Sequence, residues 1–293
     1  MTRRAPSLPD TTSGRRGFLF AGAAWLLVSL ASVSFASALP AGEGKMVSLE
    51  PKGGRVEAFL ARPPDRGRHP GVVLVHDWWG LNDQIKGVAD RLAGQGYVAI
   101  VPDLYRGKVG TDAGWAHQLS RGLDERWAVE TIGDAIDWLR SLDAREGRRP
   151  AGEGMPIAIW GIGMGGKLSL ETALAGKDLQ AAVMFYSDVE TDAQKLKPLG
   201  VPLLGIFADE DHDIPTKKVK AFEAALKEEG KDSTIIIYRS VGHGFFNEKR
   251  PNFEKTAAKM AWDRTLQFFQ ERLGAPAQGD QSPASPASGR REP

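Results

Sequence analysis

The stretch Ile157-Ala-Ile-Trp-Gly161-Ile162-Gly163-Met164-Gly165-Gly166-Lys167 decides how the rest of the chain is interpreted. Its apolar start, Ile157 to Trp160, predicts a buried strand, and Leu168 to Ala175 predicts a helix after the glycine-dense turn. Strand, tight turn and helix form a nucleophile elbow, whose sequence pattern is G-x-S-x-G. The central position normally carries Ser, Cys or Asp, but here it is Gly163. The sequence therefore predicts the turn and lacks the side chain that such a turn presents.

Apolar runs alternate with segments of helical spacing along most of the chain. The predicted strands are 46–49, 56–61, 71–75, 97–101, 157–160, 181–186, 202–207 and 233–238, and predicted helices lie between most of them. This alternation predicts an α/β fold with a mainly parallel central sheet and helices on both faces. Functional sites in such sheets lie beyond the carboxyl ends of the strands. The loops after Val75, Trp160, Phe207 and Tyr238 are therefore the candidate site loops.

Composition limits the classes of function that the chain can have. It has 293 residues, 42% of them hydrophobic, a net charge of +1 and no cysteine. The near-neutral charge gives no electrostatic argument for a nucleic-acid partner. Without cysteine there is no disulfide, no thiolate nucleophile and no thiolate metal site. No sequence pattern predicts a cofactor, and the oligomeric state is left open.

The N-terminal segment has the layout of an export signal. Arg15 and Arg16 form a twin-arginine pattern, an uncharged apolar stretch follows from Phe18 to Phe35, and Ala36-Ser37-Ala38 resembles a signal-peptidase site. We expect removal of residues 1–38 and a periplasmic or secreted protein with no membrane attachment after cleavage. An uncleaved anchor is the alternative. One domain is expected over 39–274, and the polar tail 275–293 is predicted to be disordered.

Two of the candidate loops carry an acidic cluster and a histidine. The loop after Phe207 contains Asp211, and the loop after Tyr238 contains His243 between two glycines. Elbow, acid and histidine in this order are typical of α/β-hydrolases, in which the acid orients the imidazole. A cation site is the alternative for the acidic cluster, because carboxylates suit hard ions. The cluster has no ordered ligand spacing, so we predict no metal site.

Several motifs in order resemble the dienelactone hydrolase family over about Met46 to Leu273. They are His76-Asp77-Trp78-Trp79-Gly80-Leu81-Asn82, Val88-Ala-Asp-Arg-Leu92, Gly96-Tyr97-Val98-Ala99, Val101-Pro102-Asp103-Leu104-Tyr105, Gly163-Met164-Gly165-Gly166 and His243-Gly244-Phe245. The resemblance implies an α/β-hydrolase fold and hydrolysis of small esters or lactones through a Cys-His-Asp triad.

The resemblance also assigns roles to residues of this chain. Asp211 and His243 match the acid and the histidine, and Gly163 lies where the family has its cysteine. Trp78 and Met164 would supply the backbone N–H groups of an oxyanion hole. Asp77 lies where the family usually has a glutamate, and is a further catalytic candidate. The aromatic residues Trp79 and Phe245 are candidates for substrate binding.

Two hypotheses about function follow. In the first, water activated by His243 hydrolyses a small ester or lactone in place of the missing nucleophile, because the rest of a triad retains some catalysis. In the second, the chain is a catalytically silent protein that binds a small molecule on a hydrolase scaffold. Ser187, at the end of a neighbouring predicted strand, is the one serine kept as a substitute nucleophile.

Overall fold

A computed structural model describes residues 44–50, 54–65, 67–145 and 154–274. The predicted signal segment and C-terminal tail lie outside the described residues. Within the described part, no helix is long and apolar enough to cross a membrane. The strands are β1 (Lys45–Leu49), β2 (Val56–Ala61), β3 (Gly71–Val75), β4 (Val98–Pro102), β5 (Ile157–Ile162), β6 (Ala181–Phe185), β7 (Leu203–Ala208) and β8 (Ser233–Tyr238). The helices are α1 (Asp83–Gly94), α2 (Ala113–Arg121), α3 (Glu125–Arg145), α4 (Met164–Leu174), α5 (Ala193–Leu196), α6 (Thr216–Glu228) and α7 (Lys255–Leu273).

The strands form one sheet in the order β1-β2-β4-β3-β5-β6-β7-β8. β1 pairs antiparallel with β2, and β2 pairs antiparallel with β4, whereas the six strands from β4 to β8 are parallel. The predicted α/β fold with a mainly parallel sheet is confirmed. β5 lies between β3 and β6, so the elbow that follows it is flanked by the loops after those two strands.

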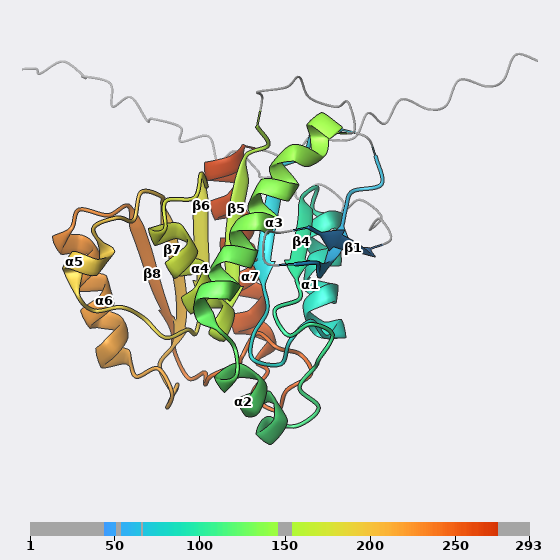
Figure 1. Cartoon of the computed structure of the whole chain (residues 1–293). Helices are drawn as coiled ribbons and strands as arrows, with labels where there is room; N and C mark the ends of the chain where they lie inside the picture. The colour runs from blue at the N-terminus through green and yellow to red at the C-terminus, as the bar shows by residue number, and fades with distance from the viewer. Residues whose placement is uncertain (1–43, 51–53, 66, 146–153, 275–293) are drawn as a thin grey trace, which may run out of the picture. The chain divides into compact units, whose positions relative to one another are not determined.

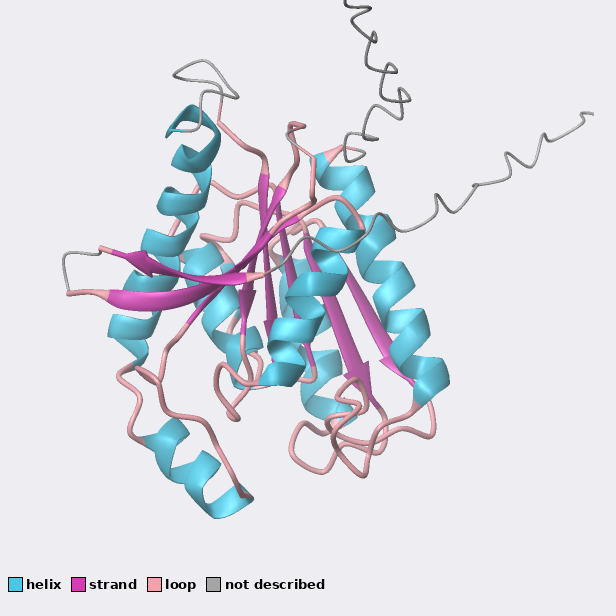
Figure 2. Cartoon of the chain, turned by 90° about the vertical axis from the view of Figure 1, so that its right-hand side faces the viewer, coloured by secondary structure: helices cyan, strands magenta, loops and turns pink. Residues whose placement is uncertain are grey.

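Helices cover both faces of the sheet (Figures 1 and 2). Alternate strand residues point to opposite faces, so the central strands, which are buried on both sides, are apolar throughout. On one face, residues such as Ile159 and Met184 pack with α3, α4, α5 and α6. On the other face, Trp160 and Phe185 pack with α1 and α7. This two-sided core fixes the strand ends that carry the candidate site.

The structure adds two helices and shifts the bounds of the elbow. The polar stretch before α3 contains α2, which begins after Asp112, whose side chain accepts the Trp115 N–H. The sequence does not predict α2, because Ala116 is its one buried residue. The short α5 lies in the segment between β6 and β7. β5 continues to Ile162 and α4 begins directly at Met164, so the turn between them is Gly163 alone.

Candidate active site

The elbow has the backbone geometry that its sequence predicts. Gly163 has φ 55° and ψ −121°, a conformation that residues with a side chain rarely adopt. Its N–H donates to the Phe185 carbonyl at 3.0 Å, and its carbonyl accepts the Gly166 N–H at 2.9 Å. Position 163 is therefore held at the tip of a sharp turn between β5 and α4.

The glycines around Gly163 are required for close packing, but Gly163 itself is not. A Cβ at Gly161 would lie 2.0 Å from the Gly165 oxygen, and one at Gly165 would lie 2.3 Å from the Val75 oxygen. A Cβ at Gly163 would meet only the Asp77 Cβ, at 3.4 Å, which is an ordinary contact. The site thus has room for a side chain at position 163.

Two backbone N–H groups flank the elbow. Among the described residues, neither the Trp78 N–H nor the Met164 N–H donates to a protein acceptor. Tyr105 contacts both residues, because its hydroxyl donates to the Trp78 carbonyl oxygen at 3.2 Å and lies 3.3 Å from the Met164 sulfur. The arrangement is suited to binding an oxyanion. This role of Tyr105 could not be predicted from the sequence, because its contacts span 27 and 59 residues.

The buried His76 holds the loop after β3 in place. The Leu104 N–H donates to its Nε2 at 3.2 Å, so Nδ1 carries the proton and donates to the Asp77 oxygen at 2.7 Å. Burial lowers the pKa of this imidazole, which keeps it neutral. His76 is thus a structural residue, and the loop after β3 owes its position to it.

Asp211 and His243 come together across 32 residues of sequence. His243 Nδ1 lies 2.8 Å from Asp211 Oδ2, and the other carboxylate oxygen accepts the N–H groups of Asp213 and Ile214, each at 2.9 Å. A carboxylate only accepts hydrogen bonds, so Nδ1 carries the proton and Nε2 can take one. The two loops are joined by a backbone bond from the Glu210 N–H to the Val241 oxygen at 3.0 Å.

The electrostatic surroundings make this imidazole a stronger base. Burial alone lowers the pKa of His243, but the hydrogen bond and charge of Asp211, with the charges of Asp213 and Asp77, raise it above its ordinary value. The Asp211 carboxylate is almost completely buried, whereas the His243 side chain is one-third exposed. The imidazole is therefore partly accessible to solvent, and a fixed carboxylate holds its Nδ1.

Asp77 is a second acidic group at the elbow. It is 8% exposed, and its Oδ1 accepts the Trp79 N–H at 2.9 Å. Burial raises the pKa of Asp77 to about 6, although the Trp79 N–H, Arg250, Asn247 and His243 oppose this shift. A carboxyl group that changes charge near neutral pH thus lies beside the empty side-chain position of Gly163.

Tyr186 is a site residue that the sequence did not indicate. It follows β6 with φ 31°, and its ring meets the His243 ring edge-on, with centroids 5.1 Å apart. Its hydroxyl is buried and has no hydrogen-bond partner among the described residues. Burial, and the charges of Asp77 and Asp211, hold the pKa of this phenol well above its usual value, so it stays protonated.

The two aromatic residues expected to bind substrate are largely enclosed. Phe245 is fully buried and packs behind Tyr186 and Tyr238, so the structure corrects that expectation and gives it a core position. Trp79 is 7% exposed, because the Arg250 guanidinium lies 3.1 Å above its ring. The half-buried Trp78, whose ring contacts Trp79, is the more accessible aromatic side chain.

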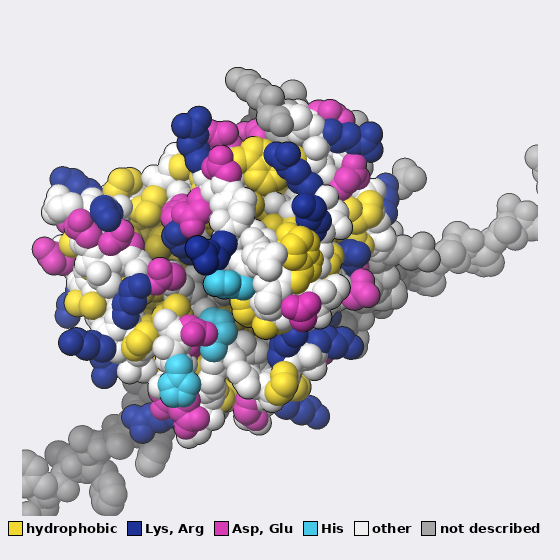
Figure 3. All heavy atoms as spheres, turned by 60° about the horizontal axis from the view of Figure 1, so that its bottom comes forward, with side chains coloured by type: hydrophobic (Ala, Val, Ile, Leu, Met, Phe, Trp, Pro, Cys, Tyr) yellow, Lys and Arg dark blue, Asp and Glu magenta, His cyan; other side chains and the backbone are white. Residues whose placement is uncertain are grey.

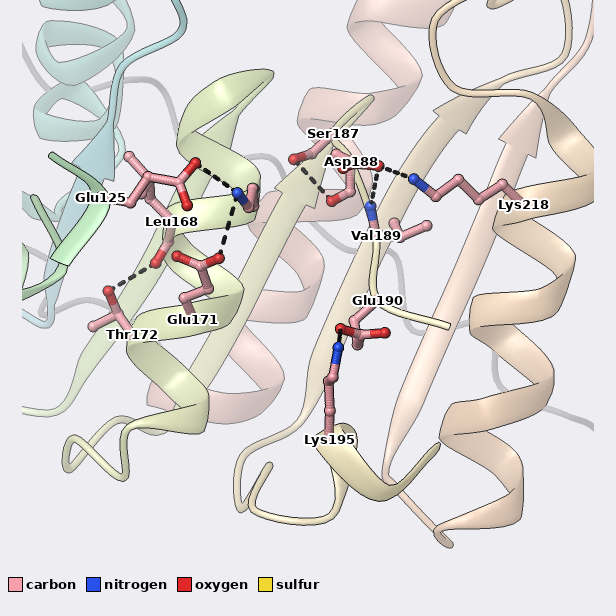
Figure 4. A network of polar contacts seen from close by, with 11 residues as sticks. Glu125, Leu168, Glu171, Thr172, Ser187, Asp188, Val189, Glu190, Lys195 and Lys218 are labelled. Atoms are coloured by element: carbon pink, nitrogen blue, oxygen red, sulfur yellow. Dashed lines mark hydrogen bonds and ion pairs between the residues drawn. The ribbon is translucent and has the colours of Figure 1, made fainter. Parts of the chain in front are cut away.

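The structure does not bring Ser187 to the histidine. Its hydroxyl donates to the Asp188 carbonyl at 3.3 Å, within the polar network beside α4 in Figure 4. The side chain is buried, and its Cβ lies 2.6 Å from where a Cβ of Gly166 would be. Ser187 therefore fills the space against α4 and lacks the contact that a substitute nucleophile needs.

The acidic cluster is mostly explained without an ion. Asp211, Asp213 and His243 have ligand atoms within 4.8 Å of one another, which is a separation that a cation could bridge. However, Asp211 uses both oxygens for the hydrogen bonds described above, and those bonds account for its burial. Figure 3 shows histidine, acidic and basic side chains near the middle of the face at the carboxyl ends of the strands.

Comparisons with known proteins agree with this fold. Residues 56–273 match the family model described as "Dienelactone hydrolase family". The chain is 32% identical over 241 residues to Protein usf of Aquifex pyrophilus, covering 78% of this chain and 99% of the relative. It is 29% identical over 235 residues to an Escherichia coli (strain K12) protein provisionally named carboxymethylenebutenolidase, covering 76% and 85%.

A solved structure gives the same fold. A provisionally named dienelactone hydrolase from Klebsiella pneumoniae subsp. pneumoniae MGH 78578 superposes with a TM-score of 0.68 at 24% identity, covering 78% of this chain and 98% of that one. The match of the family model spans the strands from β2 to β8, the elbow and the loops of Asp211 and His243. With an α/β-hydrolase sheet and that match together, the chain belongs to the dienelactone hydrolase family, a family of ester and lactone hydrolases.

Proposed function

We propose that the protein hydrolyses a small ester or lactone with water as the nucleophile and His243 as the base. The observation that carries this proposal is the 2.8 Å bond from His243 to Asp211 beside an elbow that has no side chain at Gly163. The pair can take a proton, and the room at position 163 can admit the attacking oxygen.

The proposed reaction needs only the substrate, one water molecule and residues of this chain. His243 Nε2 takes a proton from water as the water oxygen bonds to the carbonyl carbon. The Trp78 and Met164 N–H groups donate to the resulting oxyanion. When the carbon–oxygen bond to the leaving group breaks, the imidazolium returns its proton to that oxygen. A carboxylic acid and an alcohol result, or one hydroxy acid from a lactone.

Asp77 has a supporting part in this proposal. Its carboxyl group lies beside the position of the water, because its Cβ is 3.4 Å from where a Gly163 side chain would begin. When ionised, it accepts a hydrogen bond from the water and favours the imidazolium of His243. With a pKa of about 6, it is mostly ionised at neutral pH.

A binding function is the second candidate, and the missing nucleophile favours it. Direct attack by water forgoes the covalent intermediate that makes each step easier in related enzymes. In this case the elbow and its N–H groups would hold the carbonyl of a small ligand without turnover, and the Asp211–His243 pair would be a ligand contact.

Turnover of 4-nitrophenyl acetate and dienelactone by the purified protein separates the two candidates. Hydrolysis abolished by His243→Ala supports the proposed enzyme. His212→Ala is the matched control, because His212 is an exposed histidine in the acid loop and should leave the rate unchanged. Absence of turnover with saturable binding of a lactone supports the binding function. Turnover that survives His243→Ala contradicts the role given to His243.

A further inference from the structure

A concave surface lined partly by α2 lies beside the site. It has a volume of about 570 Å³, within the range of small-molecule pockets. Its walls are mostly apolar and aromatic, formed by Leu104, Tyr105, Trp115, Leu119, Leu123 and Trp127. We call this surface the α2 groove. None of its residues has a part in the proposed hydrolysis, except that the Tyr105 hydroxyl reaches the elbow on the other side.

Cations lie along the α2 groove. Arg106 and Lys108 both line it, and neither forms an ion pair or a side-chain hydrogen bond with another described residue. The Arg106 guanidinium lies 4.4 Å above the centroid of the Trp127 ring, and this contact holds it in place. The opposing charge is Asp124, whose carboxylate already accepts the Trp127 N–H at 3.1 Å. The net charge of the groove is therefore positive.

The backbone also favours this position of the guanidinium. Arg106 has φ 52°, an unfavourable conformation for a residue with a side chain. Just before it, Asp103 accepts the Tyr105 N–H at 3.0 Å and also receives the Gly107 N–H. The tight turn that these bonds close turns Arg106 out of line with β4, toward α3. A cation is thus held against an aromatic wall without an anionic partner from the chain.

We propose that the α2 groove binds a small amphipathic anion, with an aromatic ring or short alkyl chain against the tryptophans and a carboxylate at Arg106 and Lys108. The apolar walls suit the body of such a molecule, because Trp115 is 36% exposed and can lose water-accessible surface on binding. The two unpaired cations distinguish it from a neutral molecule of the same shape. This inference concerns a separate surface and does not depend on hydrolysis at the elbow.

Occupation of the groove has a route to the elbow. Tyr105 lines the groove and holds both Trp78 and Met164 through its hydroxyl. His117 of α2 also meets the Trp78 ring edge-on, at 6.5 Å between centroids. A ligand in the α2 groove therefore lies against Tyr105 and α2, which contact the carbonyl oxygen and ring of Trp78 and the side chain of Met164.

The test compares two probes of one shape by calorimetric titration of the intact mature protein. 4-Phenylbutyrate carries a carboxylate, and 4-phenylbutanol replaces it with a neutral hydroxyl. We expect the carboxylate to bind about tenfold more tightly at low salt, as two partly exposed ion pairs would give. Arg106→Gln with Lys108→Gln should abolish this difference, and Trp115→Ala should weaken both probes.

Arg126→Gln is the matched control, because Arg126 is an exposed arginine at the start of α3 outside the groove. It should leave both affinities unchanged. If the double variant does not fold, Lys108→Gln alone should reduce the difference, since that side chain is exposed. The proposal is overturned if 4-phenylbutyrate does not bind saturably, or if it binds equally to the protein and to the Arg106, Lys108 and Trp115 variants. Both readouts are affinities, so they are independent of any failure to detect hydrolysis.

Discussion

Replacing Gly163 with cysteine tests the geometry of the elbow directly. The backbone at this position has φ 55° and ψ −121°, and a new Cβ would have one ordinary contact, with the Asp77 Cβ at 3.4 Å. The added thiol should therefore fit between His243 and the two backbone N–H groups without moving either. We expect Gly163→Cys to form a thiolate–imidazole pair and to hydrolyse activated esters.

Gly163→Cys should lower the stability of the protein and raise its esterase activity, and each change can be given a magnitude. A side chain in this backbone conformation costs about 1–3 kcal/mol, with no further steric cost because nothing crowds the Cβ. For a domain of this size, each kcal/mol lowers Tm by about 2–4 °C. Loss of the nucleophile alone lowers kcat by up to about 10⁶-fold in a well-studied serine protease. We expect restoring it to raise kcat/KM for 4-nitrophenyl acetate by at least ~10²-fold.

Two control variants separate the effect of the thiol on activity from the effect of backbone strain on stability. Gly163→Ala has the same backbone penalty without a nucleophile, so it should lose stability and gain no activity. Gly176→Cys places a thiol at an exposed glycine that also has positive φ, 75°, away from the site. The natural chain has no cysteine, so iodoacetamide labels only the new thiol. Rapid labelling at position 163 that slows in the His243→Ala background would show the pair.

A folded Gly163→Cys protein that neither hydrolyses esters nor reacts faster than Gly176→Cys would refute this reasoning. It would mean that His243 Nε2 does not face the elbow, although its Nδ1 bond to Asp211 is 2.8 Å. A Tm loss much greater than that of Gly163→Ala would show instead that the thiol is crowded. Both proposed functions of the natural protein predict the gain, so this experiment tests the geometry alone.

Two further predictions concern the effect of pH, and a third concerns export. Folding raises the pKa of Asp77 to about 6, so the folded state holds this proton more tightly than the unfolded state does. Stability should therefore fall by roughly 2–3 kcal/mol as pH rises from about 4 to above 6. Asp77→Asn should lack this fall in thermal unfolding, and a variant with the same pH profile as the natural protein would contradict the shift. Turnover needs neutral His243, so it should rise with pH around a pKa above the ordinary histidine value of 6.5. Asp211→Asn should move this inflection to lower pH, because it removes the hydrogen bond and the charge that raise the pKa of His243. An unmoved inflection would exclude the Asp211–His243 pair as the titrating group. We also propose twin-arginine export, so N-terminal sequencing of the periplasmic protein should begin at Leu39, whereas full-length protein in the membrane would indicate an anchor.

The features that could be predicted from the sequence are those with a local cause. Gly161 and Gly165 must be glycine because strand, helix and the loop after β3 meet there, so the elbow is visible in the sequence. The central strands are buried on both faces, and their uninterrupted apolar runs show this. α2 has neither property. It buries a single alanine, and its polar sequence resembles a loop.

Features of the site that depend on long-range contacts could not be predicted. The hydroxyl of Tyr105 connects segments 27 and 59 residues away, and the ring of Tyr186 meets His243 only after β6 and β8 are placed. The raised pKa of Asp77 depends on how completely the folded loops bury it. Phe245 follows His243 by two residues, yet its side chain points into the core.

The glycine at position 163 has a different physical meaning from its neighbours. Side chains at Gly161, Gly165 and Gly166 would collide with backbone or with Ser187, so packing requires those glycines. At Gly163 the surroundings would accept a side chain, and only the backbone conformation opposes one. Glycine at the tip therefore removes a strain of about 1–3 kcal/mol that a nucleophile would impose. The N–H groups of Trp78 and Met164 add no hydrogen bond to the fold, because neither has a protein acceptor among the described residues. Two free N–H donors beside Gly163 are what a site for a carbonyl group requires, whether water attacks the carbonyl or the site only binds it.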